Sequence, residues 1–165
     1  MNQICIVCVD DEPEVLEAVE RDLSEFDDHF PVESASSAKA ARQLFEDLNV
    51  NGDHVGLVLC DHLMPEETGV ELLVSLSDMP SACHARRVLL TGQASHADTI
   101  EALNQGGLDY YMAKPWAGKV LKDVVRDQLT SYVIEHSPTP ASYMNILDGV
   151  KIAEFLHRSG GFSDH

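Results

Sequence analysis

The sequence alternates short apolar runs with longer stretches in which apolar residues recur every three or four positions. Runs of this length predict strands, and the recurring pattern predicts amphipathic helices. The predicted strands are residues 4–9, 30–35, 55–60, 87–91 and 109–113. The predicted helices are residues 13–26, 38–48, 70–76, 97–105 and 117–134. Five alternations of strand and helix indicate an α/β protein with a parallel sheet.

The predicted strands differ in how apolar they are, and this difference predicts their order in the sheet. Residues 4–9, 55–60 and 87–91 are nearly continuous apolar runs, as in strands buried on both faces, so we place them centrally. Residues 30–35 contain a proline and residues 109–113 are more polar, which favours the edges. This arrangement matches the order 2-1-3-4-5 of flavodoxin-like, doubly wound (βα)5 folds.

Residues 135–165 do not follow this pattern. Ser137-Pro138-Thr139-Pro140 predicts a linker. Beyond it, apolar residues between 143 and 156 fall near one helical face, and two glycines at 160 and 161 end the pattern. We therefore predict a main domain at 1–134 and a tail at 135–165, made of a linker and one amphipathic C-terminal helix. This helix either docks on its own domain or pairs with a second copy, and the chain either stands alone or begins a longer protein.

Composition and charge restrict the partners. A chain of 165 residues with 44% hydrophobic residues is globular. Its formal net charge of −17 repels nucleic acid and anionic membranes. No apolar run approaches the roughly 18 residues of a membrane span, and the N-terminus has no signal-peptide pattern. We expect a cytoplasmic protein that binds neither nucleic acid nor membrane.

Two of the four cysteines, Cys5 and Cys8, form a C-x-x-C spacing, which can indicate a metal or redox site. Both lie inside the first predicted strand, where residues three apart point to opposite faces of the sheet. We therefore interpret them as reduced core side chains.

Charged and hydroxyl side chains follow four of the predicted strands. Asp10 and Asp11 come after the first strand, Asp61 after the third, Thr91 at the end of the fourth, and Lys114 after the fifth. The carboxyl ends of parallel strands meet at one edge of the sheet, so these side chains are expected to converge there, with Asp61 facing solvent.

Three converging carboxylates repel one another. At about 4 Å and an effective dielectric constant of about 20, each pair costs about 4 kcal/mol, so such a cluster needs a cation. Oxygen ligands favour a hard divalent ion, Mg²⁺ first, with Mn²⁺ or Ca²⁺ as alternatives. Asp61 can then act as a nucleophile toward a phosphoryl group. Lys114 can neutralise charge on the transferring oxygens, and Thr91 can donate a hydrogen bond to them.

These residues form an ordered pattern that resembles the receiver domain of two-component response regulators. The resemblance covers about residues 3–134 and implies a phosphoacceptor switch that assists its own phosphorylation and dephosphorylation, rather than an enzyme. Its donor would be a sensor histidine kinase or a histidine phosphotransfer protein. The residues that carry the resemblance are Asp10-Asp11, Asp61-x-x-Met64-Pro65 with Gly69, Thr91-Gly92, Tyr111 and Lys114-Pro115.

The resemblance also implies roles for individual residues. Asp61 would accept the phosphoryl group, and Lys114, joined to its proline by a cis peptide, would pair with it. Thr91 and Tyr111 would form a switch pair that alters the surface of the fourth helix, fifth strand and fifth helix, which is also a candidate homodimer face. The implied Mg²⁺ ligands are Asp11, Asp61 and the Leu63 carbonyl, with Asp10 acting mostly through water.

Two other functions share parts of this pattern. A phosphatase of the haloacid dehalogenase kind also uses an aspartyl nucleophile, but it normally has a second acid two residues later, where this chain has Leu63. A flavodoxin-like cofactor binder would have a loop rich in hydroxyl groups and glycine after the first strand, where this chain has Asp10-Asp11-Glu12. His62, His84 and His96 have no metal-ligand spacing and are predicted to face solvent, with His62 a candidate contact for the kinase.

Overall fold

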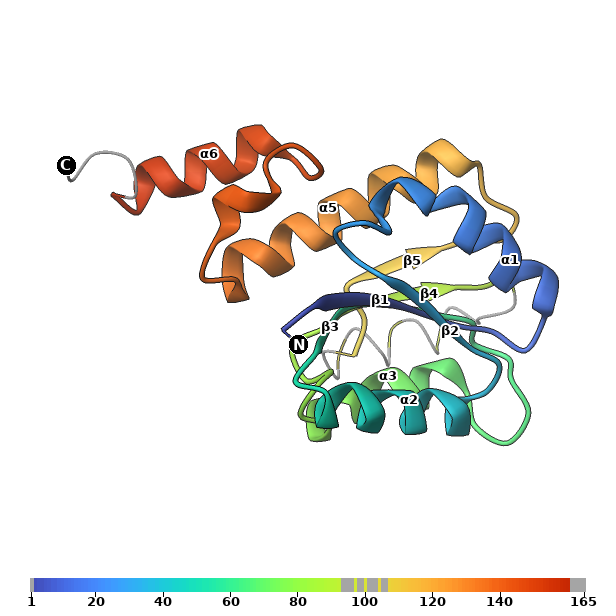
Figure 1. Ribbon diagram of the computed structural model, residues 1–165. Helices are drawn as coiled ribbons and strands as arrows, with labels where there is room; N and C mark the ends of the chain where they lie inside the picture. The colour runs from blue at the N-terminus through green and yellow to red at the C-terminus, as the bar shows by residue number, and fades with distance from the viewer. Residues whose placement is uncertain (1, 93–96, 98–99, 101–103, 105–106, 161–165) are drawn as a thin grey trace.

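The structure is a computed structural model that describes residues 2–92, 97, 100, 104 and 107–160. Its centre is one five-stranded sheet in which neighbouring strands are parallel and the order is β2-β1-β3-β4-β5 (Figure 1). The predicted flavodoxin-like fold class is therefore confirmed. The strands are β1 (Ile4–Val9), β2 (Val32–Ala35), β3 (His54–Cys60), β4 (Arg86–Leu90) and β5 (Tyr110–Met112).

Helices cover both faces of the sheet. Helices α1 (Pro13–Asp22) and α5 (Gly118–His136) lie on one face, and α2 (Ala38–Val50) and α3 (Gly69–Ser75) on the other (Figure 1). The helix predicted at 97–105 falls largely outside the described residues. Across the part of the chain that is described, no helix is long and apolar enough to cross a membrane.

The two helical layers enclose two apolar clusters, one on each face of the sheet. Alternation along β1 sends Cys5 into the cluster under α2 and α3, and Cys8 into the cluster under α1 and α5. Both thiols are buried and free, and burial raises the pKa of Cys5 to about 11. The two cysteines are core side chains, as predicted.

Several boundaries differ from the predicted ones because local contacts end an element early. The first helix stops at Asp22, and the apolar stripe continues into a short 3-10 helix, Ser24–Phe26. Phe26, at the end of this 3-10 helix, is fully buried, as are Val19 and Leu23 of the same stripe. On the next helix, Ser37 accepts a hydrogen bond from the Ala40 amide and serves as the N-cap.

The single tail helix predicted over 143–156 is wrong in its extent. The structure has a 3-10 helix, Pro140–Tyr143, followed by a turn and then α6 (Gly149–Arg158). Asp148 caps α6 by accepting from the Lys151 amide at 3.1 Å. A Cβ on Gly149 would come within 2.8 Å of the Met144 carbonyl oxygen, so glycine allows the tight turn.

The tail docks on its own domain. The ring of Tyr143 stacks on Phe30 with centroids 5.2 Å apart, and Leu147 and Ile152 are buried in the cluster under α1 and α5. The Asp148 amide also donates to the Thr130 hydroxyl of α5 at 3.1 Å. Figure 1 shows α6 beside the C-terminal end of α5, with its far end projecting from the body. Most of the predicted apolar face is therefore used within the chain, while Val150 is exposed.

Candidate functional site

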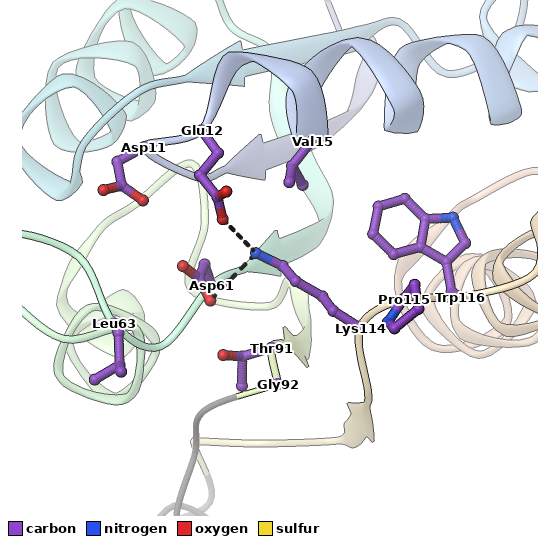
Figure 2. Close-up of a pocket in the computed structure, with 10 residues that line it drawn as sticks. All are labelled: Asp11, Glu12, Val15, Asp61, Leu63, Thr91, Gly92, Lys114, Pro115 and Trp116. Atoms are coloured by element: carbon purple, nitrogen blue, oxygen red, sulfur yellow. Dashed lines mark hydrogen bonds and ion pairs between the residues drawn. The ribbon is translucent and has the colours of Figure 1, made fainter.

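The carboxyl ends of β1, β3, β4 and β5 surround one pocket of about 630 Å³ (Figure 2). Five of the seven predicted site residues line it. Asp10 bonds one of these, Lys114, and lies in one cluster with two others, Asp11 and Asp61. The pocket also has an apolar wall opposite the acids, formed by residues 15, 115 and 116. The lining residues are Asp11, Glu12, Val15, Asp61, Leu63, Thr91, Gly92, Lys114, Pro115 and Trp116.

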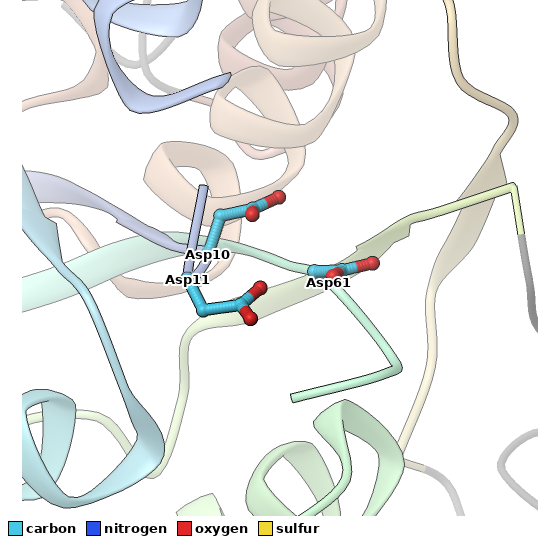
Figure 3. A group of neighbouring side chains, drawn as sticks. All are labelled: Asp10, Asp11 and Asp61. Atoms are coloured by element: carbon cyan, nitrogen blue, oxygen red, sulfur yellow. The ribbon is translucent and has the colours of Figure 1, made fainter. Parts of the chain in front are cut away.

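Three carboxylates gather at the centre of this rim. Asp10, Asp11 and Asp61 each offer one oxygen, and these oxygens lie within 4.8 Å of one another (Figure 3). Backbone amides orient two of them: Asp10 accepts from Glu12 and Asp61 accepts from His62, both at 2.9 Å. This all-oxygen set at the end of rigid strands fits a hard divalent cation.

Asp61 was predicted to face solvent, and that prediction is wrong, because only 6% of the residue is exposed. The chain folds back over it after the turn, and the Gly69 amide donates to the His62 carbonyl oxygen at 2.8 Å. The same closure buries His62, which is 4% exposed and was also predicted to face solvent. His84 is exposed as predicted, whereas His96 lies outside the described residues.

Lys114 reaches across the sheet edge to the acids (Figure 2). Its Nζ lies 2.7 Å from Asp10 Oδ2, 3.5 Å from Asp61 Oδ1 and 3.5 Å from Glu12 Oε1. Burial alone would lower the pKa of Lys114, but the hydrogen bond to Asp10 and the nearby negative charges outweigh burial and raise it. At Asp10, burial has the larger effect and raises the pKa despite the bond from Lys114. Lys114 therefore stays a cation, and its peptide bond to Pro115 is cis.

Thr91 lies on the side of the pocket away from α1 (Figure 2). Thr91 follows β4 and is fully buried. Tyr111 stands on the edge strand β5, is 37% exposed, and donates from its hydroxyl to the Thr91 carbonyl oxygen at 3.3 Å. Leu63 is 51% exposed at the opposite rim. The structure thus links Thr91 to Tyr111 directly.

Two residues at the rim were not singled out as site residues from the sequence. Glu12 was used only as an argument against a flavin loop, yet it contacts Lys114. Trp116 donates from Nε1 to Asp22 at 2.9 Å and forms a wall of the pocket. Their positions directly after the acidic pair and after Lys114-Pro115 could have indicated both.

Gly69 is required by the close approach of two backbone segments. A Cβ at this position would lie 2.0 Å from the Asp61 carbonyl oxygen. We expect Gly69→Ala to push the Asp61 backbone out of place and to lower the free energy of unfolding by about 1–3 kcal/mol. Urea denaturation measures this change.

Gly92→Ala is the matched control for Gly69→Ala. A Cβ on Gly92 meets nothing closer than the Lys114 carbonyl oxygen at 3.6 Å, an ordinary contact distance. Equal stability of the two variants would contradict the steric explanation for Gly69.

The chain is similar to known proteins over most of its length. The family described as response regulator receiver domain matches residues 6–126. The chain is 34% identical over 126 residues to the hydrogenase transcriptional regulatory protein HoxA of Cupriavidus necator, covering 76% of this chain and 24% of that protein. It is 27% identical over 129 residues to a probable cyclic di-GMP phosphodiesterase of Vibrio cholerae, covering 78% of this chain and 27% of that protein. The chain spans about a quarter of the length of these relatives.

Solved structures have the same fold. A CheY-like response regulator receiver domain protein from Methanospirillum hungatei JF-1 superposes with a TM-score of 0.70 at 24% identity, covering 82% of this chain and 100% of that chain. The signal receiver domain of an HD domain-containing protein from Pseudomonas fluorescens Pf-5 gives a TM-score of 0.68 at 26% identity, covering 82% and 93%.

Proposed function

This chain belongs to the response regulator receiver domain family, and on that premise we propose that it accepts a phosphoryl group on Asp61. The donor is a phosphohistidine of a sensor histidine kinase or a histidine phosphotransfer protein. The observation that carries the proposal is the position of Asp61 at the pocket rim, 3.5 Å from Lys114 Nζ and within one cluster with Asp10 and Asp11.

The chemistry follows from the side chains around the pocket. A carboxylate oxygen of Asp61 attacks phosphorus, the P–N bond of the donor breaks, and the leaving imidazole regains a proton, so that an acyl phosphate is formed. Lys114 offers its ammonium to the new phosphoryl oxygens, and the Thr91 hydroxyl donates to one of them. The acids that surround Asp61 disfavour an incoming anion, so the reaction needs more positive charge than Lys114 supplies.

The acidic cluster supplies a place for that charge. Asp11, Asp61 and the Leu63 carbonyl would hold Mg²⁺, and Asp10, whose carboxylate is bonded to Lys114 at 2.7 Å, would act through water. When bound, Mg²⁺ neutralises the phosphoryl oxygens during transfer.

Signal output is proposed to run through Thr91 and Tyr111. The direct contact between the Tyr111 hydroxyl and the Thr91 backbone supports a coupled movement in which Thr91 turns toward the phosphoryl group and Tyr111 moves inward. The surface that changes includes β5 and α5. The chain is therefore a phosphoacceptor switch that assists its own phosphorylation and dephosphorylation, and not an enzyme with an external product.

Incubation with acetyl phosphate and Mg²⁺ tests this function. We expect intact-mass spectrometry to show one added phosphoryl group, which is absent when a chelator replaces the metal. Failure to incorporate a phosphoryl group with Mg²⁺ present would contradict the proposal. Sustained turnover of an aryl phosphate would instead favour a phosphatase.

The location and organisation of the chain are proposals too. The four free cysteines suit a reducing compartment, which supports the cytoplasm.

We propose residues 1–134 as the receiver and 135–165 as its tail. Most apolar residues of the tail are packed on their own domain, so we propose that a homodimer would use the face of β5 and α5, where Tyr110, Tyr111 and Val120 are exposed. Light scattering with beryllofluoride tests this, and a mass that stays monomeric would contradict it.

A further inference from the structure

The loop after Asp61, residues 63–68, forms one rim of the pocket and is held in an unfavourable backbone conformation. Leu63 lines the pocket, while Glu66 has a φ of 73°, in the left-handed region that residues other than glycine rarely adopt. Such a conformation persists only where surrounding contacts impose it. We call these residues the acceptor loop and ask what holds it.

One contact joins the acceptor loop to an element remote in sequence. Arg42 of α2 binds Glu67 through two nitrogens of its guanidinium: Nε donates to Oε1 at 3.3 Å, and Nη2 pairs with Oε2. The two side chains are 37% and 25% exposed, so the pair is partly shielded from water. In Figure 1 this loop runs beside the N-terminal half of α2. A two-pronged bond of this kind fixes direction as well as distance.

The remaining contacts of the loop are local or apolar. The Glu67 amide donates to the Pro65 carbonyl oxygen at 2.9 Å, and Thr68 forms a capping box with Glu71 at the start of α3. Met64 is buried under α2 and α3. Met64 and Thr68 thus hold the loop near its two ends, and Arg42 holds Glu67, directly after the strained Glu66.

We propose that Arg42 is a positioning residue for the phosphoacceptor site, acting through Glu67 to keep the acceptor loop in the shape that presents the main chain at Leu63 to the acidic cluster. The inference rests on the proposed function, because the cluster matters only if it takes a cation. Arg42 touches neither the phosphoryl group nor the metal.

A purely electrostatic role for the pair predicts different results. Glu67 carries a negative charge on the acceptor loop, which begins two residues after Asp61. If charge alone mattered, removing Arg42 would leave this negative charge uncompensated and tighten Mg²⁺ binding, whereas neutralising Glu67 would weaken it. If position matters, both changes weaken binding.

The experiment compares Arg42→Ala, Glu67→Gln and the exchanged pair Arg42→Glu/Glu67→Arg, with Lys39→Ala as an exposed control on the same helix. Trp116 is the single tryptophan and lines the pocket, so its fluorescence reports titration with Mg²⁺ alone. Hydrogen exchange of the amides at 63–69 in metal-free protein reports the loop itself.

We expect each single variant to bind Mg²⁺ about three- to tenfold more weakly than wild type. This loss is smaller than the about 10–100-fold loss of metal affinity that follows mutation of residues bonded directly to metal ligands. Loop amides should exchange faster in both single variants, and the exchanged pair should restore both readouts. Lys39→Ala should match wild type.

Three results would overturn the positioning role. Both single variants could bind Mg²⁺ and exchange their loop amides as wild type does, or their Mg²⁺ affinities could shift in opposite directions. The exchanged pair could also bind Mg²⁺ as weakly, and exchange its loop amides as fast, as the single variants. A wild-type protein that gives no response to Mg²⁺ by fluorescence and takes up no phosphoryl group would instead overturn the proposed function.

Discussion

Asp61→Asn is expected to lower phosphoryl incorporation from acetyl phosphate by at least about a thousandfold, because an amide oxygen is a far weaker nucleophile than a carboxylate. The substitution preserves size, and the amide oxygen can still accept from the His62 amide, as Asp61 does at 2.9 Å. The fold should therefore survive, and intact-mass spectrometry in Mg²⁺ measures the loss directly.

Asp28→Asn is the matched control, since Asp28 is exposed and lies in the turn after Ser24–Phe26, beyond the C-terminal end of α1 and away from the pocket. It should incorporate as much phosphoryl group as wild type. If Asp61→Asn incorporated the phosphoryl group at the wild-type rate, Asp61 would be excluded as the acceptor.

Ile152→Ala is expected to produce the largest loss of stability, about 2–5 kcal/mol in the free energy of unfolding. Ile152 lies on α6 yet is fully buried against the side chains under α1 and α5, so truncation opens a cavity in the main core. Urea denaturation followed by circular dichroism measures the change.

Val150→Ala, two residues away on the same helix, provides the comparison because Val150 is 69% exposed. Its cost should stay within about 0.5 kcal/mol, as for other surface substitutions. If Ile152→Ala and Val150→Ala were equally stable, Ile152 would not contribute to the core. That result would contradict the docking of the tail on α5.

The sequence predicted the strand order because burial on both faces leaves a clear signal. The runs that became β1, β3 and β4 are continuous and apolar, and the structure buries nearly all of them. The side chains that follow different strands could be predicted to converge from the parallel topology alone. Asp10, Asp11 and Asp61 meet because each directly follows a strand whose end lies at the same edge.

The misjudged features depend on contacts between distant segments. The tail stripe has helical spacing throughout, so periodicity could not show the turn before α6; the Asp148-Gly149 pair was the available signal. Burial of Asp61 and His62 depends on the loop closing through Gly69. The sequence did not predict which acid Lys114 contacts in the unphosphorylated chain, and its contacts with Asp10 at 2.7 Å and Asp61 at 3.5 Å depend on side-chain reach across the sheet edge.

The most direct test of the central claim is to locate the phosphoryl group on the chain. Protein phosphorylated with acetyl phosphate and Mg²⁺ is reduced with borohydride, which converts an aspartyl phosphate into homoserine, and the peptides are sequenced by mass spectrometry. A phosphoacceptor at the end of β3 predicts homoserine at position 61 and at no other aspartate. Homoserine at Asp10 or Asp11, or at none of the three, would contradict it.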